Sequence, residues 1–274
     1  MKGSWTGAGR EVVLLHGQPG SAADWELVLP HLPGLRLMVP TRPGYEGSAA
    51  GGFAVNTAAL LRLLDATGVD RIVLAAHSWA GGVALQTALQ APDRISALCL
   101  IGSVGSSRAV TPADRVLALP GIRDGSALAM RLAGHRATRV VAASSGSSLD
   151  PEQRQDLEAT LAMWATTGAW SAFAVEQRQL VREGPALARQ LPRVQVPTVV
   201  AIGREDTVVS PAAQLDLAAR LGKAEVRLLD GGHLAMLEVP DQVAGAIQRA
   251  VQLGRAADQE RSRTRSRQAR PSGS

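Results

Sequence analysis

Short aliphatic runs alternate with longer helical stretches along most of this 274-residue chain. The runs that predict strands are residues 11–15, 35–39, 71–76, 95–101, 197–202 and 224–229. The run that starts at Arg71 continues without a polar residue to Ala76, as expected for a strand covered on both faces. Alternation of this kind predicts parallel βαβ units. The sequence therefore predicts an α/β fold with a mostly parallel, doubly wound sheet.

The predicted helices lie between these strands. Their ranges are residues 21–31, 55–68, 79–90, 211–221 and 240–253. Ser21 is a favourable N-cap residue for the first of them, and Gly68 is a typical C-terminal stop for the second.

The alternation stops between residues 103 and 194. This segment is rich in Ala, Leu and Arg, has helical periodicity and contains no convincing strand. We therefore expect a core formed by residues 1–102 and 195–254, interrupted by a helical insertion at 103–194. The length and the 46% apolar content are ample for a hydrophobic core.

The formal net charge of +5 comes from one end of the chain. Residues 261–274 contain five arginines and no acid, so the rest of the chain is formally neutral. The end of the chain has few apolar side chains with which to offset its ordering entropy, so we expect residues 255–274 to be a disordered Arg-rich tail. A solvated extension is favoured over an anchor for an anionic polymer or a membrane surface, and no nucleic acid partner is expected.

Composition also limits the location and the cofactor chemistry. No apolar run approaches the ~20 residues of a membrane span, and the first residues lack the apolar stretch of a signal peptide. We therefore expect a cytoplasmic protein that does not bind membranes. The single cysteine, Cys99, allows no internal disulfide or cysteine metal cluster, and we expect it to be a buried, inert thiol. No metal and no cofactor are implied.

Ser78 lies where the third predicted strand meets a helix. A serine at such a sharp turn exposes its Oγ above the edge of the sheet, and the residues two before and two after it must be small. Here these residues are Ala76 and Ala80. The position predicts that Ser78 is a nucleophile.

An acid and a histidine follow the last two predicted strands. Asp206 comes shortly after the strand that ends at residue 202, and His233 after the strand that ends near residue 229. A serine hydroxyl needs an imidazole to take its proton, and that imidazole needs a carboxylate to orient it. Ser78, His233 and Asp206 therefore form a candidate triad at the carboxyl edge of the sheet. Glu205 and Asp230 are neighbouring acids that could replace Asp206.

The loop after the first predicted strand reads His-Gly-Gln-Pro-Gly at residues 16–20. Such a loop can aim the backbone N–H of Gln18 at a developing oxyanion. The N–H of Trp79, next to the nucleophile, is the second candidate donor. The side chains of His16 and His77 are expected to be structural, as is Glu238.

With these motifs in this order, residues 11–254 resemble the α/β-hydrolase family. Residues 42–48, RPGYEGS, look like the family's loop after the fourth sheet strand, and residues 233–240, HLAMLEVP, resemble its catalytic-histidine segment. The resemblance implies that residues 103–194 are a mobile helical cap over the active site. Trp164, Trp170 and Phe173 then either line an apolar roof or pack the cap on the core.

Three features depart from the family pattern. The family usually begins with two antiparallel strands, whereas the first predicted strand here starts at Glu11, so either the sheet is shortened to about six strands or the sequence starts downstream of the natural start. Thr41 stands where an Asp is common before Arg-Pro-Gly, and Ala76 and Ala80 stand where glycines are usual.

The resemblance implies a serine hydrolase that cleaves an ester-type carbonyl substrate, a small molecule with an apolar acyl part, through an acyl-enzyme. A dehalogenase or epoxide hydrolase would need Asp at position 78, and epoxide hydrolases also need cap tyrosines, whereas Tyr45 is the only tyrosine. A hydroxynitrile lyase would need a lysine in the insertion, and none is present there.

Other activities fit the same triad. A proline-iminopeptidase-like enzyme could bind an amine through glutamates of the insertion, namely Glu152, Glu158, Glu176 and Glu183. A carbon–carbon bond hydrolase, a thioesterase and a perhydrolase are further alternatives. A non-catalytic ligand-binding member of the fold is the alternative from another class. The oligomeric state is left open.

Overall fold

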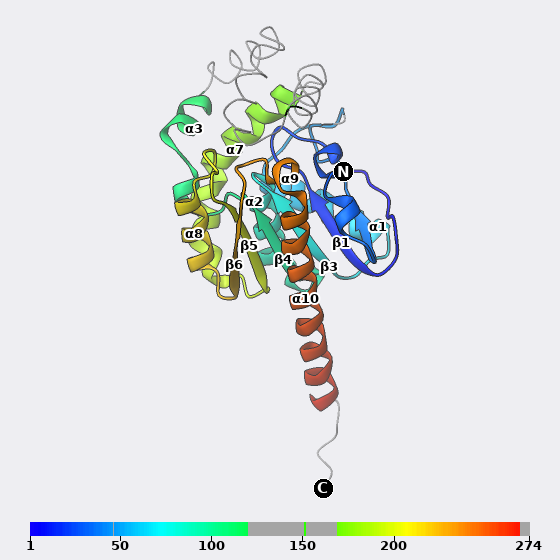
Figure 1. The fold of residues 1–274 in the computed structure, drawn as a ribbon. Helices are drawn as coiled ribbons and strands as arrows, with labels where there is room; N and C mark the ends of the chain where they lie inside the picture. Colours follow the sequence, from blue (N-terminus) through cyan, green and yellow to red (C-terminus); the bar gives the residue numbers. More distant parts are fainter. Residues whose placement is uncertain (46, 120–150, 152–168, 269–274) are drawn as a thin grey trace.

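The computed structural model describes residues 1–45, 47–119, 151 and 169–268. Its centre is a six-stranded sheet (Figure 1). The strands are β1 (Arg10–Leu15), β2 (Leu35–Met38), β3 (Ile72–His77), β4 (Ile95–Ile101), β5 (Thr198–Gly203) and β6 (Ala224–Leu229). They lie in the order β2-β1-β3-β4-β5-β6, and every neighbouring pair is parallel. The predicted α/β fold with a parallel, doubly wound sheet is confirmed, and the sheet of the described chain has six strands.

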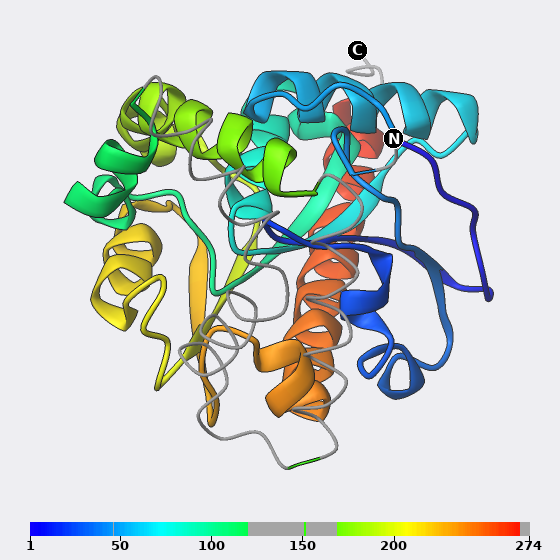
Figure 2. The ribbon, with the colours of Figure 1, turned by 90° about the horizontal axis from the view of Figure 1, so that it is seen from above.

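Helices cover both faces of this sheet (Figure 2). On one face lie α1 (Phe53–Ala66), α2 (Ala80–Gln90), α7 (Ala169–Gln190) and α8 (Pro211–Arg220). On the other face lie α10 (Pro240–Gln268) and the short α9 (Ala235–Glu238), together with the 3-10 turns η1 (Ala22–Trp25) and η2 (Leu29–His31). The remaining described elements are α3 (Pro112–Leu117), η3 (Pro92–Arg94), η4 (Ser107–Ala109) and η5 (Leu191–Arg193).

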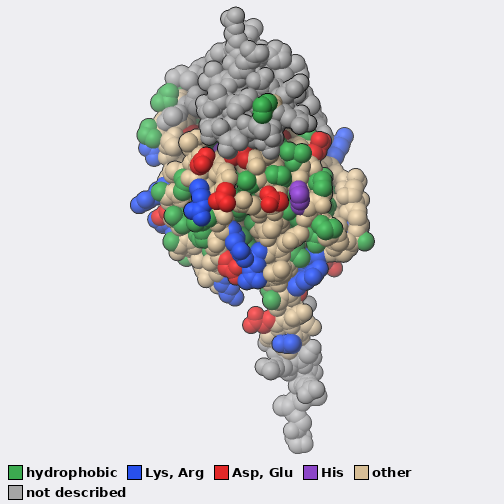
Figure 3. Space-filling view, viewed as in Figure 1, with side chains coloured by type: hydrophobic (Ala, Val, Ile, Leu, Met, Phe, Trp, Pro, Cys, Tyr) green, Lys and Arg blue, Asp and Glu red, His purple; other side chains and the backbone are tan. Residues whose placement is uncertain are grey.

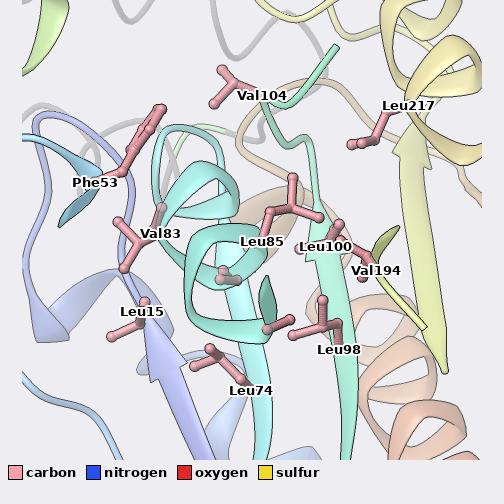
Figure 4. Close-up of a cluster of buried hydrophobic side chains, with 14 of the residues drawn as sticks. Leu15, Phe53, Leu74, Val83, Leu85, Leu98, Leu100, Val104, Val194 and Leu217 are labelled. Atoms are coloured by element: carbon pink, nitrogen blue, oxygen red, sulfur yellow. The ribbon is translucent and has the colours of Figure 1, made fainter. Parts of the chain in front are cut away.

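The alternation of side chains along the strands divides the core into two layers. Leu74 of β3 points to the layer shared with α1 and α2, whereas Val73 packs against the layer that contains α10. Figure 4 shows part of the first layer, where Leu98 and Leu100 of β4 lie against Leu85 of α2. Truncating one of these fully buried leucines to Ala would cost about 2–5 kcal/mol. The packed strands therefore form a rigid base for the loops at their carboxyl ends.

The helix predicted at residues 21–31 is wrong, because the chain forms no α-helix there. The structure has two 3-10 turns there, η1 and η2, and Pro30 stands at the start of η2. Proline has no N–H to donate and disfavours a helical residue before it, so a continuous α-helix cannot pass this point without losing a hydrogen bond. Ser21 caps η1, since its Oγ accepts from the N–H of Ala23 while Asp24 accepts from the N–H of Ser21.

The first residues of the chain lie beside the outer edge of β2. Thr6 and Leu37 exchange two backbone hydrogen bonds of 2.9 and 2.8 Å, and Lys2 forms a second antiparallel bridge with Thr41. These bridges occupy part of the edge that β2 would otherwise expose.

The predicted disorder of residues 255–274 is wrong for residues 255–268, which continue α10 as far as Gln268. The carboxylate of Asp258 lies 2.5 Å from Arg10 and 2.6 Å from Arg71, and Arg261 lies 2.6 Å from Asp93. These ion pairs hold the helix on the body, and no Gly or Pro interrupts it after residue 254. Its C-terminal part stands out from the body (Figures 1 and 3). Residues 269–274 lie outside the described part of the chain.

The predicted insertion at 103–194 is described only in part. Its described residues, 103–119, 151 and 169–194, form helices and 3-10 turns and contain no strand. Residues 120–150 and 152–168, including Trp164, lie outside the described residues. Within the described ranges, no helix combines the length and apolar content that a bilayer crossing needs.

Candidate active site

Ser78 lies at the sharp turn between β3 and α2. Its φ is +53°, and among the described residues it is the one non-glycine residue with a positive φ. Its N–H donates to the carbonyl of Ile101 at 2.9 Å, and its carbonyl accepts from Gly81 at 3.0 Å. A non-glycine residue in this region carries backbone strain, which persists only where surrounding packing holds it. The turn thus holds the Ser78 hydroxyl at the carboxyl edge of the sheet.

The structure brings Ser78, His233 and Asp206 together. Nε2 of His233 lies 2.9 Å from Oγ of Ser78. On the other side of the ring, Nδ1 of His233 lies 3.1 and 3.0 Å from the two carboxylate oxygens of Asp206. All three side chains are largely buried. In the tautomer with a proton on Nδ1, the imidazole donates to Asp206 and its Nε2 is free to accept the serine proton.

Asp206 is held by three donors besides the histidine contact. Its Oδ1 accepts from the backbone N–H groups of Val208 and Val209 at 2.9 and 2.8 Å, and its Oδ2 accepts from Nε2 of Gln214 at 3.0 Å. The alternative acids point elsewhere: Glu205 is exposed, and Asp230 pairs with Arg204 at the surface. The acid that faces His233 is therefore Asp206.

Several contacts fix the loop that carries His233. The ring of His77 donates from Nε2 to the carbonyl of His233 at 2.8 Å, and Glu238 accepts from the N–H of Gly232. Burial lowers the pKa of His77 well below its ordinary value, so the ring is neutral and serves as a structural donor. Gly102 has a φ of +53°, and a Cβ there would lie 3.2 Å from Asp206 and 3.4 Å from His233. Only a glycine leaves the acid and the histidine this close to β4.

The loop of residues 16–20 lies directly over Ser78. A Cβ on Gly17 would be 3.1 Å from Cβ of Ser78 and 2.7 Å from the His77 ring. In the described part of the chain, the backbone N–H groups of Gln18 and Trp79 take part in no hydrogen bond, while the N–H of Ser78 is already used by Ile101. The side chain of Gln18 bonds Gln177 of α7 at 2.8 Å. These two N–H groups lie next to Ser78 and on the loop above it.

A buried ion pair behind this loop was not foreseen from the sequence. Arg42 pairs with Glu176 of α7, and both side chains are fully buried. The phenol of Tyr45 donates to Glu176 at 2.6 Å, and the guanidinium lies over the rings of Tyr45 and Trp79. Burial alone would lower the pKa of Arg42, but the charge of Glu176 outweighs it and raises the pKa. The one signal in the sequence is the position of Glu176, which lies among buried residues of an amphipathic helix.

His16 joins the same network. Its Nε2 accepts from the backbone N–H of Arg42 at 3.0 Å, and its Nδ1 lies 3.0 Å from the carbonyl of Gly17. Burial, together with the charge of Arg42, lowers the pKa of His16 well below its ordinary value. The ring is therefore a neutral link between the loop at 16–20 and the loop at 42–45.

The glutamates considered for amine binding are engaged in other contacts where they are described. Glu176 is paired with Arg42, and Glu183 accepts from the N–H of Phe53 at 2.8 Å at the start of α1. Glu152 and Glu158 lie outside the described residues. Trp170 is buried and contacts Phe173 edge to face, and neither has a described contact with Ser78. In the described part of the chain, no three His, Cys, Asp or Glu side chains are grouped to hold a metal ion, and burial raises the pKa of the Cys99 thiol.

Comparison with known proteins agrees with this arrangement. Residues 11–240 match the family model of the alpha/beta hydrolase fold. The chain is 28% identical over 252 residues to Lipase LipV of Mycobacterium tuberculosis, covering 86% of this chain and 91% of that protein. It is 35% identical over 114 residues to 2-hydroxy-6-oxo-2,4-heptadienoate hydrolase of Pseudomonas putida, covering 38% of this chain and 41% of that protein. Its fold is similar to that of a thermophilic esterase from Thermogutta terrifontis, with a TM-score of 0.79 at 22% identity, covering 92% of this chain and 93% of the other.

The chain belongs to the alpha/beta hydrolase fold family. Its relatives and its fold together identify an enzyme with hydrolase activity.

Proposed function

We propose that this protein is a serine hydrolase that cleaves carboxylic esters through an acyl-enzyme intermediate. One observation carries the proposal: Nε2 of His233 lies 2.9 Å from Oγ of Ser78, while its Nδ1 faces the carboxylate of Asp206. This is the geometry in which an imidazole can take the proton of a serine hydroxyl.

In the proposed reaction, Oγ of Ser78 attacks the carbonyl carbon of the ester while Nε2 of His233 takes its proton. The carbonyl oxygen becomes an oxyanion, which the N–H groups of Gln18 and Trp79 stabilise. The intermediate then collapses, and the leaving alcohol takes the proton from His233. Water attacks the acyl-Ser78 in the same way, with His233 as the base, and releases the acid.

The surroundings of His233 favour a small-molecule substrate with an apolar acyl part. Leu234 and Leu237 follow the histidine and pack against a small apolar cluster that includes Tyr45, Ala169 and Ala172. The last two of these residues belong to α7, which is part of the segment 103–194 that we propose to be the cap. Relatives named as a lipase and as esterases are consistent with this substrate class.

Hydrolysis of a carbon–carbon bond next to a carbonyl is the second candidate. A relative named as a 2-hydroxy-6-oxo-2,4-heptadienoate hydrolase is 35% identical over 38% of the chain. An iminopeptidase-like activity is less well supported, because Glu176 and Glu183 are occupied by other groups.

The first test is covalent labelling with a fluorophosphonate probe, followed by mass mapping of the modified peptide. We expect phosphonylation of Ser78 and none in the Ser78→Ala variant. Ser103→Ala is the matched control, because its hydroxyl donates to the carbonyl of Ala76 at 3.0 Å and should not react. Labelling that survives Ser78→Ala, or no labelling of the folded protein, would contradict the proposal and favour a non-catalytic, ligand-binding member of the fold.

A panel of substrates then separates the activities. Acyl p-nitrophenyl esters of graded chain length, aminoacyl amides and a vinylogous diketone acid report ester, amide and carbon–carbon bond cleavage. We expect the largest kcat/KM among the esters. A larger kcat/KM for the diketone would favour carbon–carbon bond hydrolysis over ester hydrolysis.

A further inference from the structure

Arg42 holds the loop that carries the first proposed oxyanion donor. Its Nε donates to the carbonyl of His16 at 2.8 Å, and its Nη2 donates to the carbonyl of Gly17 at 2.5 Å. These two carbonyls precede Gln18, whose backbone N–H is the proposed donor. Because one rigid guanidinium binds both carbonyls, it fixes the orientation of the peptide unit that presents this N–H.

Glu176 of α7 contacts the site through both its side chain and its backbone. Its carboxylate is the counter-ion of Arg42, with an additional hydrogen bond from Tyr45 at 2.6 Å. Its backbone carbonyl accepts from the indole N–H of Trp79 at 3.1 Å. Trp79 supplies the second proposed donor, so a single residue of α7 contacts the groups that orient both donors.

The neighbouring residue strengthens the same link. Oε1 of Gln177 accepts from the side chain of Gln18, and its Nε2 donates to Asp114 of α3. Helix α7 is therefore connected to the loop at 16–18 in two ways. Gln177 bonds Gln18 directly, whereas Glu176 acts through Arg42.

We infer that Arg42 and Glu176 are positioning residues that hold the two oxyanion donors in place, and that they couple the seating of α7 to the geometry of the oxyanion site. The inference rests on the proposed function, because that function assigns the donor role to Gln18 and Trp79. Neither side chain touches Ser78 or His233 in the described structure. Their effect therefore belongs to the transition state, where the oxyanion forms, and not to the binding of the ester ground state.

The central variant is Arg42→Lys, which keeps the positive charge but replaces the planar fork by a single ammonium group. Loss of one oxyanion donor costs about 100-fold or more in kcat, so a displaced donor should lower kcat for a p-nitrophenyl ester about 10- to 100-fold. The KM should stay within about two-fold of that of the unmodified enzyme. The affinity for an alkyl boronic acid, which forms a tetrahedral anion on a serine, should fall by a similar factor.

Two further variants separate positioning from folding. Tyr45→Phe removes one hydrogen bond to Glu176 and should lower kcat only a few-fold. Arg42→Met combined with Glu176→Met removes both charges together and avoids a buried, unpaired ion, so its Tm should exceed that of Glu176→Met alone. Its kcat should nevertheless stay as low as that of Arg42→Lys.

The matched control is the pair Arg249 and Glu225, which joins α10 to β6 with contacts of 2.7 and 2.8 Å. Arg249→Lys should leave kcat and boronic acid affinity unchanged. The inference is overturned if folded Arg42→Lys retains both, or if the double Met variant regains kcat together with its Tm. Failure of Ser78 to react with the fluorophosphonate would instead overturn the proposed function, so the two failures are distinguishable.

Discussion

Oγ of Ser78 lies 2.9 Å from Nε2 of His233, although 155 positions separate the two residues in the chain. The parallel sheet explains this proximity. Ser78 follows β3 and His233 follows β6, and the carboxyl ends of parallel strands meet at the same edge. The packing of the parallel strands thus brings Ser78 and His233 together.

The Asp206–His233 contact yields the first prediction. In Asp206→Asn the carboxylate that orients the imidazole and stabilises its protonated form is lost, so kcat should fall about 10⁴-fold while the fold is kept. Steady-state ester hydrolysis and circular dichroism check this. Asp230→Asn is the matched control, because Asp230 is exposed and pairs with Arg204 at the surface. The kcat of Asp230→Asn should stay within about two-fold of that of the unmodified enzyme. A large loss in this variant would indicate that Asp230, and not Asp206, is the acid that orients His233.

Gly102 yields the second prediction. Gly102→Ala should lower both stability and kcat, because a side chain at a φ of +53° is strained by about 1 kcal/mol and its Cβ would press on Asp206 and His233. Gly68→Ala is the control, since Gly68 has a φ of +66° but nothing within 4 Å of an added Cβ. Urea denaturation should show a loss in both variants, whereas kcat should fall only in Gly102→Ala. If Gly102→Ala and Gly68→Ala have equal kcat values, the close approach of Asp206 and His233 to Gly102 does not matter for catalysis.

Asp24 gives a prediction for the pH dependence of stability. Burial raises its pKa from 3.8 to about 7, so between about pH 4 and pH 7 the folded protein holds a proton that the unfolded chain has released. This contribution to stability is present at low pH and is lost as the pH rises towards 7. Asp24→Asn should remove this dependence, because the amide has no proton to lose and can still accept from Ser21.

The measurement is the free energy of unfolding in urea at pH 5 and pH 8. Relative to Asp24→Asn, the unmodified protein should lose about 1–2 kcal/mol between these values, since the side chain is partly exposed and solvent screens the effect. Ser21→Ala is the control, because it weakens the cap but keeps the carboxyl group. Because the Ser21 hydroxyl also lowers the pKa of Asp24, Ser21→Ala should lower stability at both pH values and keep or enlarge the loss between them. Parallel pH profiles for Asp24→Asn and the unmodified protein would contradict the account.

The position of most elements could be predicted from the sequence because local signals determine it. The six aliphatic runs mark the strands within one or two residues, and the order of Ser78, Asp206 and His233 along them places all three at one edge. Other features depend on partners far away in the chain. Arg42 and Glu176 are 134 residues apart, and Asp258 holds α10 through Arg10, 248 residues away. Helical periodicity can mark one member of such a pair as buried, as it does for Glu176, but a single sequence carries no signal that identifies the partner.

The ion pairs of α10 give a prediction for truncation. Removing residues 261–274 eliminates the exposed pair between Arg261 and Asp93, which is worth about 1 kcal/mol or less, so Tm and ester hydrolysis should change little. Removing residues 255–274 also leaves Arg10 and Arg71 without Asp258, and Tm should then fall clearly while kcat at 25 °C is retained. Differential scanning calorimetry and steady-state kinetics of both truncations check this. Loss of activity in the shorter truncation would show that the Arg-rich end takes part in catalysis.

The central claim is that an acyl group is carried by Ser78 during turnover. The most direct measurement is mass spectrometry of the enzyme quenched in acid during hydrolysis of a p-nitrophenyl ester, with peptide mapping of any added acyl group. We predict an acyl mass on the peptide that contains Ser78 and none in Ser78→Ala. Turnover by Ser78→Ala at the rate of the unmodified enzyme, or an acyl group mapped to another residue, would contradict the account.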